Sequence, residues 1–167
     1  MKLEEFWKWP IIRLNIGCGF RPKPKEEGWI NIDFDFSCNP DLVWDIRNGL
    51  PFKNDSVEEF YLSHVLEHFT PEQFVYVIRE IWRTGKRDSV VKIIVPMWNS
   101  IGAHDLDHRM VVTRKTFEIW ESGKSGVQSY NLTTLGFMFF KIKEIIEDNE
   151  GKINPEFQMY VTLEVDK

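Results

Sequence analysis

The chain has 167 residues, of which 43% are hydrophobic and 28% are charged, and its formal net charge is −5. This length favours a single domain spanning residues 1–167, and the hydrophobic fraction excludes a disordered chain. The acidic balance argues against a broad nucleic-acid-binding face, which requires many cations on one surface.

Cysteine usage and hydropathy predict where the protein works. The two cysteines, Cys18 and Cys38, show no spacing typical of a disulfide framework. The first ten residues, MKLEEFWKWP, lack the apolar stretch of a signal peptide, and no run approaches the about 18 apolar residues of a membrane span. These features predict a reduced, cytoplasmic protein with no membrane partner.

Apolar, β-branched stretches predict the strands of a sheet that is covered on both faces. In chain order they are Ile11 to Ile16, Trp29 to Asp33, Asp41 to Asp45, Val57 to Ser63 and Val90 to Pro96. Two further stretches, Phe137 to Ile146 and Phe157 to Val165, are separated by a turn at Asn149 to Asn154. Such a close pair predicts an antiparallel hairpin at the C-terminus.

Two helices are predicted from their start signals. Thr70 is a good N-cap, with Pro71 at the first helical position and Gln73 at the capping-box position, and Gly85 is a stop signal. Apolar residues at helical spacing between them give the helix one buried face. A second helix is predicted to start after Thr113 and to end near Gly123.

The predicted fold is therefore α/β, with a Rossmann-like, mostly parallel sheet, helices on both faces and a C-terminal antiparallel hairpin. The first crossover, from Cys18 to Gly28, contains Pro22 and Pro24 and has little room for a helix. We expect this abbreviated crossover to leave part of one sheet face less covered. A partner subunit could cover it, which would make the protein a homodimer.

Three predicted strands end in residues suited to a nucleoside ligand, and ligands of open parallel sheets bind beyond the carboxyl ends of the strands. Gly17 and Gly19 would let backbone approach a ligand, because they lack side chains. Asp33 could accept hydrogen bonds from both hydroxyls of a ribose, and Asp45 from the exocyclic amine of a purine. Each of these three signals could by itself be a turn or cap residue. Their occurrence in chain order, each at the end of an apolar strand, favours a nucleoside-binding site.

This pattern differs from a dinucleotide-binding site. The third glycine of G-x-G-x-x-G is replaced by Pro22, and Asp33 comes sooner than the about 20-residue spacing of that fingerprint. A pyrophosphate also requires a helix N-terminus at the glycine turn, which the short crossover does not supply. A nucleoside cofactor without phosphate is therefore favoured over NAD or FAD.

The stretch from Leu14 to Pro96 resembles the class I S-adenosylmethionine-dependent methyltransferases, and among them the short type 11 group. The shared motifs are LNIGCG, GWINID, LPFKNDSVEE and SHVLEH, in that order along the chain. A weaker similarity continues through HDLDHRMVVTRKTFEIW. The chain departs from the group at Asn15, where many members have an acid, and at WRTGKRDS, which replaces the usual LKPGG turn.

The resemblance implies a methyl transfer from S-adenosylmethionine to an acceptor by in-line displacement, with a small-molecule acceptor favoured. It assigns the glycine turn to the methionine part of the cofactor, Asp33 to the ribose, and the positions around Phe34 and Asp45 to the adenine. Ser63 and His64 would face the sulfonium and the acceptor. The implied cofactor-binding residues are Asn15, Gly17, Cys18, Gly19, Asp33, Phe34, Asp45, Ile46 and Ser63.

The four histidines raise other possibilities, because they form two pairs at i, i+4. HVLEH fits H-x-x-E-H, so a zinc hydrolase using His64, Glu67 and His68 is an alternative. The motif follows a strand directly and precedes a new helix start, whereas zinc ligands of this type lie within one long helix. A metal site on His104, Asp105, Asp107 and His108 is a further alternative, whereas the favoured interpretation includes no metal site.

The histidines also supply the candidate catalytic residues. His64, Asp107 and His108 could orient or deprotonate an acceptor, since the pKa of histidine suits general-base catalysis near neutrality. A different class of function stays open: a binding module that retains the cofactor but is inactive or requires a partner.

Overall fold

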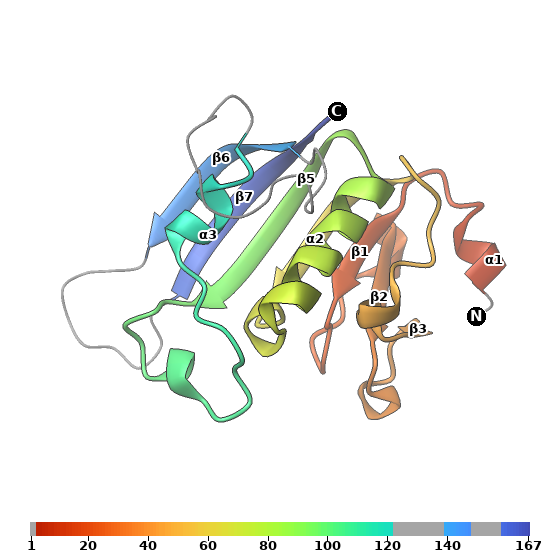
Figure 1. The fold of residues 1–167 in the computed structure, drawn as a ribbon. Coiled ribbons are helices and arrows are strands. Elements are labelled where there is room, and N and C mark those ends of the chain that lie inside the picture. The colour runs from red at the N-terminus through yellow and green to blue at the C-terminus, as the bar shows by residue number, and fades with distance from the viewer. Residues whose placement is uncertain (1–2, 122–138, 148–157) are drawn as a thin grey trace.

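The described residues of the computed structural model, 3–121, 139–147 and 158–167, contain one seven-stranded sheet with the order β3-β2-β1-β4-β5-β7-β6 (Figure 1). The strands β1 to β5 pair in parallel, and β7 runs antiparallel between β5 and β6. The bounds are β1 Arg13–Ile16, β2 Trp29–Asp33, β3 Leu42–Val43, β4 Val57–Ser63, β5 Gly85–Pro96, β6 Phe139–Glu147 and β7 Gln158–Asp166. The predicted Rossmann-like sheet with a C-terminal hairpin is confirmed.

Two strands differ in length from the prediction. β3 keeps only two residues of the predicted stretch, because it is an edge strand that pairs with β2 through Ile32 and Asp33 alone. β5 begins at Gly85 rather than Val90. Its polar first residues are accommodated by a register shift in the pairing of β5 with β4, between Val57 and Glu59. Phe137, Met138 and the predicted hairpin turn lie outside the described residues.

The long helix α2, Pro71–Thr84, crosses one face of the sheet (Figure 1). It begins as predicted: the Thr70 hydroxyl accepts from the Gln73 amide at 3.3 Å, and the Gln73 side chain accepts from the Thr70 amide at 3.0 Å. Its buried residues Phe74, Val77, Ile78 and Ile81 join the hydrophobic core, and Thr84 is buried with its hydroxyl donating to the Glu80 carbonyl at 2.7 Å.

Two short helices lie before β1 and after β5 in the chain. α1, Leu3–Phe6, buries Phe6, and α3, Arg114–Glu118, begins after Thr113 as predicted. α3 is shorter than expected, although Phe117 and Trp120 are both buried against Phe74. In the described part of the chain, no helix has the length and apolar character needed to cross a bilayer.

The first crossover contains only the 3-10 turn η1, Lys25–Glu27, and a buried network of amides covers the sheet there. The Asn15 side chain donates to Asn31 Oδ1 at 2.8 Å and to the Arg21 carbonyl at 3.2 Å. Asn31 also accepts from the Lys23 amide at 2.7 Å and donates to the Lys23 carbonyl at 2.9 Å. These bonds hold the loop against β1 and β2, so hydrogen bonds replace the packing that a crossover helix would supply.

The side chains of Glu80 and Arg83 join α2 to the loop before β4. Arg83 donates to the carbonyls of Leu50 and Phe52 at 2.9 and 3.0 Å, and to Glu80 Oε2 at 2.7 Å. Glu80 also accepts from the Leu50 amide at 2.7 Å. The hydrogen bond from Arg83 lowers the pKa of the Glu80 carboxyl below its usual value of 4.5.

We expect Arg83→Ala to lower the free energy of unfolding at pH 7 by about 2 kcal/mol, since hydrogen bonds to charged groups contribute roughly 1.5–3 kcal/mol. The pKa of Glu80 is lower in the folded protein than in the unfolded chain. The stability that the Glu80–Arg83 pair contributes is therefore fully present above the pKa of the unfolded chain, and it is lost as pH falls through the pKa of the folded protein. Urea denaturation of both proteins should therefore show a smaller difference at pH 3. The exposed Arg79→Ala is the control, expected to change stability by less than about 0.5 kcal/mol.

Candidate functional site

A cavity of about 460 Å³, here called the strand-end cleft, lies at the carboxyl ends of β1, β2 and β4. Its volume lies within the roughly 300–1,000 Å³ typical of small-ligand sites. Eight of the predicted site residues line it: Gly17, Gly19, Asp33, Phe34, Asp45, Ile46, His64 and Asp107. Residues that are far apart in the sequence thus share one cavity.

The glycine turn is built for close backbone approach. Gly17 and Gly19 have φ values of 64° and 49°, in the left-handed region that favours glycine. A Cβ on Gly17 would collide with the side chain of Val65, whereas nothing lies within 4 Å of a Cβ on Gly19. The turn therefore packs against Val65 at Gly17, and it leaves open space beside Gly19.

Asp33 connects this turn to the end of β2. Its Oδ2 accepts from the Gly19 amide at 2.8 Å and its Oδ1 from the Asp35 amide at 3.0 Å. The residue is only 8% exposed, yet it borders the cleft. A carboxylate oxygen has more than one lone pair, so each oxygen of Asp33 can accept a further hydrogen bond from a ligand.

Asp45 lines the cleft from the segment after β3, where it caps the 3-10 turn η3, Ile46–Asn48. Its carboxylate accepts from the Arg47 side chain at 2.7 and 2.9 Å and from the Arg47 amide at 2.9 Å. The Arg47 side chain lowers the pKa of Asp45, so this group is ionised near neutrality. Phe34, 71% exposed, adds an apolar surface at the same cleft.

A larger cavity of about 1,130 Å³ adjoins the first, and we call it the crossover cleft because the loop of the first crossover forms one wall. It shares Gly17, Gly19 and His64 with the strand-end cleft. The remaining predicted site residues line it: Asn15, Cys18, Ser63 and His108. The amide of Asn15 is already engaged by Asn31 and Arg21, so this residue supports the wall of the cleft.

His64 stands where the two clefts meet, directly after β4. Its backbone φ is 55°, which is uncommon outside glycine and is typical of functional sites. Its Nδ1 lies 3.2 Å from Glu67 Oε1, and its Nε2 lies 3.1 Å from Gln158 Nε2. Gln158 thus contacts one ring nitrogen of this exposed imidazole, and the Glu67 carboxylate lies close to the other.

The H-x-x-E-H motif does not form one helical pair of ligands. His64 precedes the 3-10 turn η4, Leu66–His68, and the motif is divided between the strand end and this turn. His68 instead faces the loop after β5: its Nδ1 lies 3.4 Å from Asp107 Oδ2, and its ring packs edge-on against His108 with centroids 4.8 Å apart.

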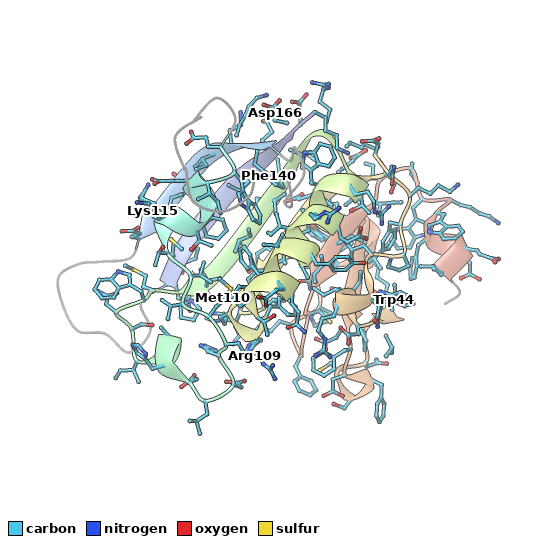
Figure 2. The ribbon with its side chains drawn as sticks, in the orientation of Figure 1. Trp44, Arg109, Met110, Lys115, Phe140 and Asp166 are labelled. Atoms are coloured by element: carbon cyan, nitrogen blue, oxygen red, sulfur yellow. The ribbon has the colours of Figure 1, made fainter. Side chains whose placement is uncertain are left out.

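Several cleft residues were not predicted from the sequence. Trp44, Arg47, Val65 and Arg109 all line the strand-end cleft. Figure 2 shows Trp44 on the β3 side and Arg109 in the segment that precedes α3. The position of Trp44 beside Asp45 was a usable signal, whereas Arg109 is placed by the hydrogen bond of its amide to the Glu67 carbonyl at 2.8 Å.

The thiol of Cys18 is buried in the glycine turn, and burial raises its pKa to about 11. We expect iodoacetamide at pH 8 to modify the partly exposed Cys38 well before Cys18, because only about one Cys18 thiol in a thousand is ionised at that pH. Mass spectrometry of peptides from Cys38→Ser protein measures Cys18 alone. Alkylation of folded Cys18 as fast as in urea-unfolded chain would contradict the burial.

No protein-family model matches the chain, and no curated protein matches its sequence. Solved structures do match. An S-adenosylmethionine-dependent methyltransferase from Archaeoglobus fulgidus superposes with a TM-score of 0.64 at 18% identity, covering 96% of this chain and 89% of that one. The N-methyltransferase NodS from Bradyrhizobium japonicum, in complex with S-adenosylhomocysteine, has a TM-score of 0.64 at 11% identity, covering 94% and 79%.

The [4+2]-cyclase SpnF also matches, with a TM-score of 0.60 at 12% identity and coverage of 93% of this chain and 74% of that one. At such identities the likeness concerns the fold, and it agrees with the strand order and the antiparallel β7. The chain has the fold of the class I S-adenosylmethionine-dependent methyltransferases.

Proposed function

We propose that the protein is an S-adenosylmethionine-dependent methyltransferase that binds its cofactor in the strand-end cleft. The observation that carries this proposal is the bond between Asp33 and the Gly19 amide. It fixes an acidic strand end against a left-handed glycine turn, and Asp45 lines the same cavity. A nucleoside with a zwitterionic tail suits this combination of acceptors and open backbone.

Each wall of the strand-end cleft has a proposed role. Asp33 would accept from the ribose hydroxyls, and Asp45 with Ile46 would hold the adenine edge beside Phe34. The turn from Gly17 through Cys18 to Gly19 would receive the methionine part. The bound cofactor would supply an activated methyl group, whose carbon would bond to the acceptor's nucleophile in line as its bond to the sulfonium sulfur breaks.

The crossover cleft is the proposed acceptor site, because it meets the strand-end cleft at Gly17, Gly19 and His64. His64 would hold or accept the acceptor's proton at one of its ring nitrogens, and Ser63 would face the same point. Asp107 and His108 would orient the acceptor from the loop after β5. A small molecule fits a cavity of about 1,130 Å³.

A second candidate is a cofactor-binding module without methyl transfer. The match to the [4+2]-cyclase SpnF supports this second candidate, because SpnF has a similar fold and is named for a reaction other than methyl transfer. Both candidates require the same strand-end cleft. They differ in turnover: a methyltransferase converts S-adenosylmethionine to S-adenosylhomocysteine with some acceptor, and a module does not.

Calorimetric titration of S-adenosylmethionine and S-adenosylhomocysteine into chelator-treated protein tests the proposal. We expect saturable binding in the micromolar range with one site per chain. Circular dichroism on the same sample establishes that the protein is folded. A folded protein that binds neither compound would refute the cofactor assignment and both candidates with it.

A further inference from the structure

We propose that Glu67, His68 and His108 bind one divalent cation of the zinc type at the junction of the two clefts. One donor atom from each of the three residues lies within 4.8 Å of the others. Glu67 and His68 come from η4, and His108 comes from the loop after β5. His68 lines the strand-end cleft and His108 the crossover cleft, which places the cluster in the wall between them.

The first supporting feature is the carboxylate of Glu67, which is only 2% exposed. Among the described residues, neither of its oxygens accepts a hydrogen bond. Oε1 lies 3.2 Å from His64 Nδ1, a close contact without hydrogen-bond geometry. Because a buried carboxylate is unfavourable unless it is paired, a cation on the free oxygen would compensate its charge.

The second feature is the state of the two imidazoles. His108 Nδ1 is buried and has no hydrogen-bond partner in the described part of the chain. His68 Nδ1 faces Asp107, with 3.4 Å to its Oδ2 and 3.5 Å to its carbonyl, which leaves Nε2 as the nitrogen for a metal. Metal-bound histidines usually donate their other ring nitrogen to a carboxylate or carbonyl in this way.

The donor set indicates the kind of cation. Two imidazoles and one carboxylate suit zinc, with one coordination position left open. Zinc bonds of about 2.0–2.2 Å bring donor atoms to roughly 3.4 Å from one another, so donor atoms now up to 4.8 Å apart would have to approach by as much as about 1.4 Å. His68 and His108 are only partly buried, so rotation of their side chains would supply this movement. The open position would take an oxygen or nitrogen of a ligand, and its use for a methyl acceptor rests on the proposed function.

Zinc titration of chelator-stripped protein, followed by calorimetry, tests the site without any activity assay. We expect one zinc per chain, and at least tenfold weaker binding after His68→Ala, His108→Ala or Glu67→Gln. Cobalt as a probe should give visible d–d absorption that the variants lose. The matched control is His104→Ala, an exposed histidine of the same loop outside the cluster, expected to bind zinc as wild type.

The proposal is overturned if folded wild-type protein takes up no zinc, or if His108→Ala and His104→Ala have the same affinity. Circular dichroism and thermal melts of every variant identify those that fold, and the two histidine variants suffice if Glu67→Gln does not. The S-adenosylhomocysteine titration is run on the same stripped sample, so that a missing cation site and a missing cofactor site are distinguished.

Discussion

Replacing Asp33 with asparagine is expected to weaken S-adenosylhomocysteine binding by about 100-fold, or roughly 2.7 kcal/mol. Asparagine keeps the size of the side chain but loses its charge and one acceptor oxygen. Charge-assisted bonds to the ribose would be lost, and the bond from the Gly19 amide would weaken. Calorimetric titration of both proteins measures the change.

The neighbouring Asp35→Asn is the matched control, since it removes one carboxylate from the same loop. Asp35 accepts from the Ser37 amide at 2.8 Å and does not line the strand-end cleft. We expect its affinity to stay within about twofold of wild type, as for a screened surface charge. Equal affinities of Asp33→Asn and wild type would show that the ribose assignment is wrong.

Gly17→Ala is expected to lower the free energy of unfolding by about 2–5 kcal/mol. A left-handed backbone costs an alanine roughly 1–2 kcal/mol, and overpacking adds about 1–3 kcal/mol. The overpacking arises because the new methyl group would collide with the buried side chain of Val65. Urea denaturation at pH 7 gives the difference.

Gly19→Ala separates strain from collision, because its φ of 49° is also left-handed but its Cβ would meet nothing within 4 Å. We expect it to lose only about 1–2 kcal/mol of stability. Its methyl group would project into the shared mouth of both clefts, so affinity for S-adenosylhomocysteine should fall instead. If the two variants are equally stable, Val65 does not support the turn.

In the short first crossover, the sequence correctly predicts that no helix forms, but it does not predict which residues replace the helix. Pro22 and Pro24 predicted that no helix would form, and only η1 is present. The amides that replace the helix, Asn15 and Asn31, lie in separate strands and meet only because β1 and β2 pair in parallel at those positions. The resemblance implies that Asn15 belongs to the cofactor site, and in the structure its side chain donates to Asn31 and to the Arg21 carbonyl.

Local signals in the sequence were sufficient to predict the capped start of α2, the strands of the sheet with their C-terminal hairpin, and the glycines and acids at the strand ends. Each follows from neighbouring residues through backbone preference, periodicity or capping. Which side chains share a site depends on contacts between distant parts of the chain, such as that of His64 with Gln158, which are 94 residues apart. The same folding brings donor atoms of Glu67, His68 and His108 within 4.8 Å of one another, whereas the sequence pattern pairs His64 with His68. Such pairings depend on how η4 and the loop after β5 meet at the end of the sheet, which no local pattern encodes.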